Sequence, residues 1–479
     1  MQATLPRTTA KLFYFYLVAD LILIGLLSLN DGFRILDDLN STQFESLSEK
    51  MFAMQFYILA VFTFNLILVL FSNDVRLKKK SRREEVFLLC LWSVIVFIPA
   101  ALSLEKSRNY LSKYFYLFGV GHLFPNFADL RGTIAAMNKV NEVGESFQIE
   151  CQKIEEPCLG WRWTYGSAIL RIPTFGIIRE KNAPFIAFFL FVALIICFWY
   201  LAKTKLEIIL FSVFAFSGTS LLIVERMNID ILVLPLIILI SKLKKLKLLG
   251  SFCIFQFWLL LTLTKYYTFP LFFAFMILRR NRIERLLYLT ISLFALYSMY
   301  MDLSKIGFDS FNFGYAATHG LKVLTGFASG KSYPGFSSSN VANYVVALTL
   351  FIIALFFFKL YKKVNFVISD DQFIIMFSLS YLVFFSTWLL SANYPYRLVS
   401  SFIFIPFFTR LFGTNILWSS VNLSLLFAMF VGIHITLSPL RNIFIGIFAS
   451  SLSAIAIHIF RDNDLWSKLK KEFSLTVVG

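Results

Sequence analysis

Several short motifs that mark nucleotide and metal chemistry are missing from the sequence. There is no P-loop, no G-x-G-x-x-G ahead of a helix and no nucleophile elbow. Nucleotide-driven chemistry therefore has no support. The chain has only 4 His, and no His, Cys or carboxylate spacing resembles a set of metal ligands. We accordingly predict neither a metal site nor a cofactor.

Cysteine is also scarce, with 5 residues in the whole chain. Cys90, Cys197 and Cys253 lie in apolar runs. Cys151 and Cys158 share a long polar segment, on either side of a short turn that contains a proline. If this segment is extracytoplasmic, Cys151 and Cys158 are the one pair placed to form a disulfide.

Charged residues make up 15% of the chain, whereas hydrophobic residues make up 58% and include 58 Phe. The mean hydropathy is +0.73. This apolar content exceeds what one soluble core of this length requires, so we expect lipid to be the solvent. The first apolar stretch has no A-x-A-like cleavage site and is expected to remain as a span.

The apolar runs predict an all-α polytopic membrane protein. Bilayer hydrocarbon of about 30 Å requires about 20 apolar residues per helix, and fewer where a helix is broken or shielded by its neighbours. On this basis we expect about fourteen spans. They are 12–30, 51–72, 86–104, 184–202, 207–224, 229–241, 248–264, 266–278, 286–301, 344–358, 373–391, 399–409, 415–438 and 442–460.

The formal charge of +17 does not indicate a nucleic-acid partner, because Lys and Arg fall in short clusters between apolar runs. Alternating spans place more than half of them on one side, which the positive-inside rule identifies as cytoplasmic. These cations are Arg7, Lys11, Arg76, Lys78, Lys79, Lys80, Arg82, Arg83, Lys203, Lys205, Lys242, Lys244, Lys245, Lys247, Arg279, Arg280, Arg282, Arg285, Lys359, Lys362, Lys363, Arg410, Arg461, Lys468, Lys470 and Lys471.

This topology divides the chain into four regions. N-terminal transmembrane helices (1–104) precede a long extracytoplasmic loop (105–184). A transmembrane core (185–460) with a second external loop (302–343) leads to a cytoplasmic tail (461–479). Both termini are then cytoplasmic. No tandem helical repeat is visible, which argues against a transporter built from two similar halves.

The outward turns carry more polar residues than connecting loops need. Glu225, Arg226, Asn228 and Asp230 form E-R-M-N-I-D between two spans. Ionisable residues near membrane depth are costly and often functional. An ordinary loop would need only one or two of these side chains, so we favour a functional site at this turn.

Two later outward turns combine tyrosines with a cation. One is K-Y-Y, with Lys265 and Tyr267, and the other is N-Y-P-Y-R-L, with Asn393, Tyr396 and Arg397. The alternative interpretation is an interfacial tyrosine beside a snorkelling cation. Function and this structural alternative both stay open for these turns.

The long external loop holds Asp129 and Arg131 in F-A-D-L-R, ahead of a predicted short helix over 132–140. An aspartate in front of a helix is often only an N-cap. It is also a carboxylate on the outer side, where a soluble acceptor would arrive. We therefore keep Asp129 as the candidate catalytic base, with the N-cap as the alternative.

These motifs resemble those of bacterial polytopic glycosyltransferases of family 87, in the GT-C superfamily. The corresponding stretches of that family often read E-R-G-N-I-D, N-Y-D-Y-R-L and K-x-Y-P, after an external loop with a D-x-R-like aspartate. The resemblance covers roughly residues 127–398. This chain departs from it at Met227, where Gly is usual, at Pro395, where Asp is usual, and at Thr268, where Pro is usual.

The resemblance implies an enzyme that transfers a sugar from a polyprenyl-phosphate donor to a glycan or lipid-linked acceptor, on the outer face of the bacterial cytoplasmic membrane. Its partners would then be this donor, the acceptor and membrane lipid. Asp129 would be the catalytic base, and Arg226, Lys265 and Arg397 would bind the donor phosphate. The residues expected to orient these groups or bind sugar are Glu225, Asn228, Asp230, Tyr267, Asn393 and Tyr396.

Two other functions remain open on the sequence. A polysaccharide polymerase or ligase that uses a diphosphate-linked glycan would share outward arginines and a large external loop. A lipid-linked oligosaccharide flippase, which is not an enzyme, would suit about fourteen spans. A flippase would line a central cavity with charges from both halves, whereas here the polar candidates gather in the outer turns.

Reporter fusions test the topology. Fusions at Lys80, Lys245 and Arg282 should all report the cytoplasm, because each lies in a basic loop between spans. A fusion at Glu142, in the long loop, should report the outside. If the Glu142 fusion also reported the cytoplasm, the orientation and every outward site assigned here would be overturned.

Overall fold

The computed structural model describes residues 128–143, 170, 178–215, 217–279, 281–306, 340–362, 364, 370–390, 395–411, 416–431 and 438–462. Every regular element in these ranges is a helix. They are α5 (Ala128–Val143), η4 (Glu180–Asn182), α7 (Ala183–Leu201), α8 (Lys205–Ala215), α9 (Gly218–Arg226), η5 (Ile229–Leu232), α10 (Val233–Ile240), η6 (Leu243–Lys245), α11 (Leu248–Thr264), η7 (Tyr266–Leu271), α12 (Phe272–Leu278), α13 (Arg282–Ile306), α15 (Asn340–Tyr361), α16 (Asp371–Leu390), η10 (Pro395–Ile403), α17 (Phe404–Leu411), α18 (Ile416–Val431) and α19 (Ser438–Asp462).

Three of the described helices, α15, α16 and α19, are long and apolar enough to cross a membrane. Shorter apolar helices include α7, α11 and α18. The all-helical class and the membrane-compatible helices agree with the sequence prediction. The first three predicted spans and most of the long loop, including Cys151 and Cys158, lie outside the described residues.

Helix boundaries follow the predicted spans closely in most of the described core. α11 occupies the predicted span 248–264. The predicted span over 207–224 consists of two separate helices, α8 and α9. The hydroxyls of Ser217 and Ser220 both donate to the carbonyl of Phe214, each at 2.6 Å. Ser217 also caps α9, so these side chains end one helix and begin the next.

Three short predicted spans are composite: η5 leads into α10, η7 into α12 and η10 into α17. A 3₁₀-helix rises about 2.0 Å per residue, more than an α-helix, so a short segment reaches further. Pro270 lies inside η7, and Pro395 begins η10. Each 3₁₀-helix follows or contains one of the polar motifs, so the motifs enter the bundle on narrow, tightly wound turns.

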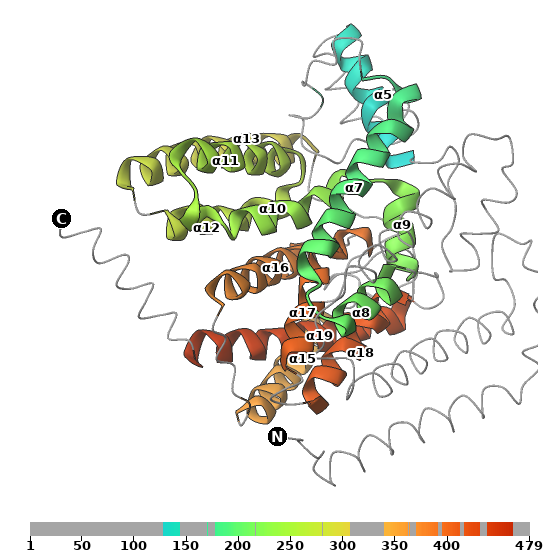
Figure 1. The fold of residues 1–479 in the computed structure, drawn as a ribbon, viewed down its shortest axis with the longest axis vertical. Helices are drawn as coiled ribbons and strands as arrows, with labels where there is room; N and C mark the ends of the chain where they lie inside the picture. Colours follow the sequence, from blue (N-terminus) through green and yellow to red (C-terminus); the bar gives the residue numbers. More distant parts are fainter. Residues whose placement is uncertain are drawn as a thin grey trace, which may run out of the picture.

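Phenylalanine packing holds η10 in the middle of the bundle. The ring centroid of Phe402 lies 4.6 Å from that of Phe198 in α7 and 5.0 Å from that of Phe430 in α18. Both contacts are edge-to-face, which is a favoured aromatic geometry. The contacts of Phe402 therefore fix η10 relative to α7 and α18. Elsewhere in the bundle, Figure 1 shows α11 and α13 side by side, with α10 and α12 next to them.

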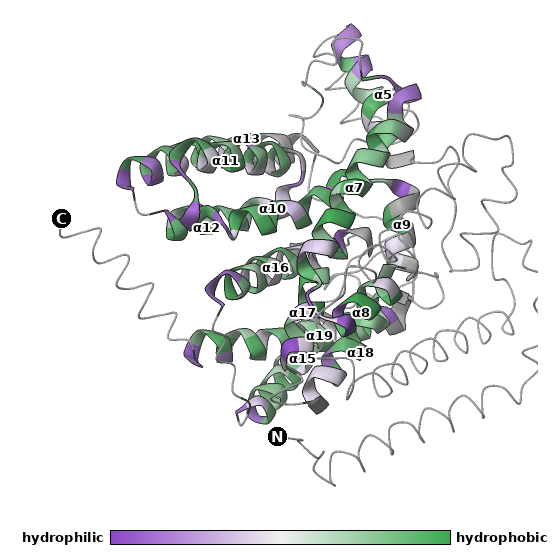
Figure 2. Cartoon of the chain, viewed as in Figure 1, coloured by the Kyte–Doolittle hydropathy of each residue, from purple (hydrophilic) through white to green (hydrophobic). Residues whose placement is uncertain are grey.

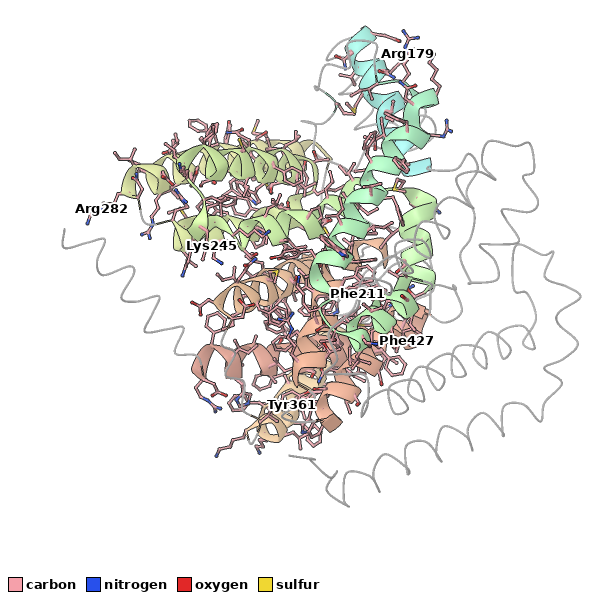
Figure 3. The ribbon with its side chains drawn as sticks, in the orientation of Figure 1. Arg179, Phe211, Lys245, Arg282, Tyr361 and Phe427 are labelled. Atoms are coloured by element: carbon pink, nitrogen blue, oxygen red, sulfur yellow. The ribbon has the colours of Figure 1, made fainter. Side chains whose placement is uncertain are left out.

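Basic segments that are distant in sequence meet at one end of the helices. Arg279 Nη1 donates to the carbonyl oxygens of Leu243 at 2.9 Å and Leu246 at 2.8 Å. These bonds join the segment before α13 to the segment before α11. Figure 3 labels Lys245 and Arg282 on the same side of the bundle, and Figure 2 shows hydrophilic helix ends gathered there. We call this side the basic end.

Two further contacts belong to the basic end. Lys242 Nζ and Lys203 Nζ lie 4.4 and 4.8 Å from the ring centroid of Tyr200. Arg410 Nε lies 3.6 Å from Glu207 Oε1. The predicted basic loops that hold Lys203, Lys242, Arg279 and Arg410 therefore lie on one side of the described core. Which compartment this side faces remains a prediction.

Candidate functional site

The E-R-M-N-I-D turn is built by two helix ends that meet at a left-handed residue. α9 ends at Arg226, and Met227 then adopts φ 45° and ψ 50°. The Asn228 side chain next accepts a hydrogen bond from the backbone N–H of Asp230, at 3.2 Å. This cap starts η5, so Asp230 lies in its first turn. Local backbone chemistry thereby directs the Asp230 carboxylate into the bundle, where the residue is 1% exposed.

Three side chains from two other turns meet at this carboxylate. The Tyr267 hydroxyl donates a hydrogen bond to Asp230 Oδ1. Lys265 Nζ lies 3.3 Å from Asp230 Oδ2, and Arg397 Nε lies 4.0 Å from the same oxygen. The Arg397 guanidinium carbon also lies 5.5 Å from the centroid of the Tyr267 ring, within cation–π range. We call Asp230, Lys265, Tyr267 and Arg397 the ion cluster.

Backbone and threonine contacts hold the K-Y-Y turn in place. Lys265 follows the last residue of α11, and its carbonyl accepts from the backbone N–H of Thr268 at 3.0 Å and from its hydroxyl at 2.9 Å. Thr262 shares a 2.8 Å hydrogen bond with that hydroxyl. Trp258 Nε1 donates to the Thr268 carbonyl at 3.1 Å. The Lys265 backbone is therefore fixed where its side chain meets Asp230.

The ion cluster is almost removed from water. Lys265 is 2% exposed, and the Arg397 side chain is 11% exposed. With one carboxylate and two cations, the cluster has a formal charge of +1. A buried cation keeps a strong field because little water screens it, so such a cluster attracts an anion. Arg397 is the member that remains most accessible to one.

The structure brings together five of the predicted site residues: Asn228, Asp230, Lys265, Tyr267 and Arg397. Tyr267 and Asp230 were expected to bind or orient substrate, and here they also bind each other. Glu225 and Arg226 form the last turn of α9, just before the cluster, and Tyr396 precedes Arg397 in η10. Asn393 lies outside the described residues.

Asp129 lies in the first turn of α5. The predicted helix over 132–140 is longer at both ends, and it begins at Ala128. Asp129 is thus inside the helix, and not the residue that precedes it, as the N-cap alternative required. α5 packs against α7 and α9, and Leu130 and Ile134 join the main apolar core. The helix that carries Asp129 therefore neighbours the helix that ends at Arg226.

Two carboxylates that the sequence analysis did not single out are buried at the basic end. Glu207 accepts from the backbone N–H groups of Lys203 at 2.5 Å and Thr204 at 3.0 Å, and from the Thr409 hydroxyl at 3.0 Å. Glu284 pairs with Arg279 at 2.6 Å, and this hydrogen bond raises the pKa of the arginine. Both carboxylates tie helix ends together, a role that only their contacts reveal.

A neutral polar network joins the C-terminal helices. The Tyr361 and Ser451 hydroxyls lie 2.6 Å apart, Asn422 Nδ2 donates to the Tyr361 oxygen at 2.8 Å, and Ser451 donates to Asn422 Oδ1 at 2.7 Å. The three groups satisfy one another in a buried ring. Such interhelical hydrogen bonds stabilise helix pairs in apolar surroundings, and we assign this network a structural role.

Comparisons with protein-family models, with curated proteins and with solved structures found no match to this chain. Within the described ranges, no group of three His, Cys, Asp or Glu side chains is placed to hold a metal ion. The functional proposal below consequently rests on the geometry of the ion cluster and on the sequence motifs.

Removal of the Asp230 charge should destabilise the protein strongly. Asp230→Asn keeps the shape of the side chain but leaves Lys265 buried without its carboxylate, which typically costs about 3–5 kcal/mol. Thermal unfolding of the purified protein in detergent measures the effect. The double variant Asp230→Asn with Lys265→Met should recover much of the loss, because it removes both buried charges.

Glu142→Gln is the matched control for this measurement. It also removes one carboxylate, but from an exposed position on α5, where surface substitutions usually change stability by about 0.5 kcal/mol or less. Equal melting temperatures for Asp230→Asn and Glu142→Gln would show that the ion cluster does not stabilise the fold.

Proposed function

We propose that the chain is a membrane glycosyltransferase that moves a sugar from a polyprenyl-phosphate donor to a glycan or lipid-linked acceptor at the extracytoplasmic face. The observation that carries this proposal is the meeting of three separate turns at the ion cluster. A positively charged, water-poor site of this kind suits a phosphate group. The apolar helices around it suit a donor whose tail lies in lipid.

Phosphate binding assigns distinct roles within the cluster. Arg397 has the planar fork that recognises phosphate oxygens and is the more exposed of its two cations. Lys265, which is more deeply buried than Arg397, adds a second positive charge. Asp230 holds both cations at one carboxylate, so their positions are set before the donor arrives. Such preorganisation is what stabilises charge on a leaving phosphate in the transition state.

The backbone at Met227 supports the resemblance to family 87. A left-handed φ costs an ordinary residue about 1–2 kcal/mol, whereas glycine adopts it readily. The similar motif E-R-G-N-I-D has Gly at this place, so the conformation seen here is one that this motif would favour. The Asp that is usual at Pro395 is absent, and Asp230 is the carboxylate that Arg397 contacts.

In the proposed reaction, an acceptor hydroxyl oxygen attacks the anomeric carbon of the donor sugar. The bond between that carbon and the phosphate oxygen breaks, and its electron pair leaves with polyprenyl phosphate. Asp129 takes the hydroxyl proton. Arg397, Lys265 and Arg226 stabilise the charge on the leaving phosphate, so the chemistry needs no obligatory metal ion.

The proposed orientation places the ion cluster outside and the basic end in the cytoplasm, with the chain in the bacterial cytoplasmic membrane and both termini inside. The positive-inside rule supports this orientation. Exposed Tyr297, Tyr300 and Tyr344 also lie at the predicted outer ends of α13 and α15. Tyrosines at such positions are typical of the membrane interface.

Purified protein in proteoliposomes can be offered a panel of polyprenyl-phosphate sugars, with release of polyprenyl phosphate as the measurement. We expect at least one sugar of the panel to be hydrolysed or transferred. Consumption of diphosphate-linked glycans alone would favour a polymerase or ligase. Movement of a labelled lipid-linked oligosaccharide across the bilayer, with no donor consumed, would favour a flippase.

Two variants should then differ in the kinetic constant that they change. Asp129→Asn keeps the size of the side chain but cannot accept a proton, so kcat should fall by about 10²-fold or more with little change in KM. Arg397→Ala should instead raise KM for the donor, because a cation facing a phosphate already acts in the ground state.

Glu142→Gln, on the same helix as Asp129, is the control for loss of a carboxylate and should leave kcat unchanged. If Asp129→Asn kept near wild-type turnover while Glu225→Gln or Asp230→Asn was inactive in folded protein, the base would belong to the E-R-M-N-I-D turn. Thermal unfolding of each variant separates loss of folding from loss of catalysis.

A further inference from the structure

η10 (Pro395–Ile403), which carries Arg397 of the ion cluster, is an unusually long 3₁₀-helix. It has 9 residues, whereas 3₁₀ segments longer than about 3–4 residues are uncommon. Their hydrogen bonds have poorer geometry than those of an α-helix, and such a stretch often marks a hinge. η10 continues directly into the α-helix α17, which begins at Phe404. An α-helical form of η10 would therefore extend a helix that already exists.

Two consecutive hydroxyls of η10 lack a hydrogen bond in this conformation. Ser400 and Ser401 are fully buried, and neither hydroxyl has a hydrogen-bond partner in the part of the chain that the structure describes. A buried hydroxyl without a partner lowers stability. In an α-helix, a serine hydroxyl can donate to the carbonyl four residues earlier, as Ser212 and Ser386 do at 3.0 and 2.6 Å. An α-helical η10 would offer Ser400 and Ser401 the same kind of acceptor.

The type of helix also decides where Arg397 lies. Phe402, five residues further on, packs between Phe198 and Phe430 and fixes the inner part of η10. Each residue turns the chain by about 120° in a 3₁₀-helix and by about 100° in an α-helix, and the rise falls by about 0.5 Å. Over five residues, conversion would rotate Arg397 by about 100° around the helix axis and draw it about 2.5 Å closer to Phe402. Arg397 would then leave Asp230.

Asp230 would keep two partners without Arg397. The Tyr267 hydroxyl donates to Oδ1, and Lys265 Nζ lies 3.3 Å from Oδ2. Arg397 Nε lies 4.0 Å from Oδ2 and is the more distant of the two cations. Different contacts therefore favour the two forms of η10. The 3₁₀ form has the ion pair between Arg397 and Asp230, and an α-helical form would gain the serine hydrogen bonds.

We propose that η10 is a release switch. Its 3₁₀ form, which the structure shows, holds Arg397 at the ion cluster, and a transient α-helical form withdraws Arg397 so that a bound phosphate group can leave. A site that is preorganised for phosphate holds a phosphate product as well as the donor, and product release often limits turnover. This inference rests on the proposed phosphate site, but it does not require sugar transfer.

Dissociation of polyprenyl phosphate that carries no sugar tests the switch in the full-length protein. Ser400→Ala with Ser401→Ala removes both hydroxyls that the α-helical form would satisfy, so that form becomes harder to reach. The dissociation rate should fall at least about threefold, while the equilibrium affinity changes little, because the 3₁₀ form predominates in the free and the bound protein. The matched control, Ser212→Ala with Ser386→Ala, removes hydroxyls that are already bonded in α-helices and should keep the wild-type rate.

Three results would overturn the proposal. Faster dissociation from the Ser400→Ala with Ser401→Ala protein would indicate that the serines bind the ligand themselves. An unchanged rate would show that η10 takes no part in release, and equal slowing in the control would indicate a general effect on the bundle. Sugar transfer is measured separately with the donor panel, so its failure is distinguishable from failure of the switch.

Fluorine NMR needs no ligand, so it covers a double variant that fails to fold or a wild-type protein that binds no polyprenyl phosphate. A trifluoromethylphenylalanine in place of Tyr396, beside Arg397, should show relaxation dispersion as η10 exchanges between its two forms. Ser400→Ala and Ser401→Ala should each reduce this dispersion, whereas Ser386→Ala should keep it. No dispersion in the wild-type background, or equal dispersion in all three variants, would contradict the proposal.

Discussion

Asp230 is a buried carboxylate, and a carboxylate that is removed from water needs cations and hydrogen bonds close to it. Burial of an unpaired charge costs several kcal/mol even after the protein relaxes. Lys265 and Tyr267 of the K-Y-Y turn and Arg397 of η10 meet the requirement. The carboxylate thus fixes η5, the end of α11 and η10 relative to one another.

Buried carboxylates are stabilised in different ways at the two ends of the described bundle. At the basic end, Glu207 is held by backbone N–H groups and by Arg410, and Glu284 is held by Arg279, which also joins a neighbouring segment. At the other end, Lys265 and Arg397 lie close to the Asp230 carboxylate. The carboxylates at the basic end tie helix ends together, and we propose that the ion cluster binds an anion.

The proposed sugar transfer follows from charge held at the ends of apolar helices. In the proposed reaction the ion cluster would bind the donor phosphate, and Asp129 lies on a helix that packs beside α9.

The sequence by itself determined the helical class and the positions of most described helices, because both depend on the local density of apolar residues. It also predicted that basic segments share one side, since alternation follows from counting spans. It did not reveal the break at Ser217, which depends on side-chain hydrogen bonds to Phe214. Only the tertiary structure decided that Lys265, Tyr267 and Arg397 meet at Asp230, because pairing between turns separated by many residues depends on how the helices pack, and no local pattern encodes it.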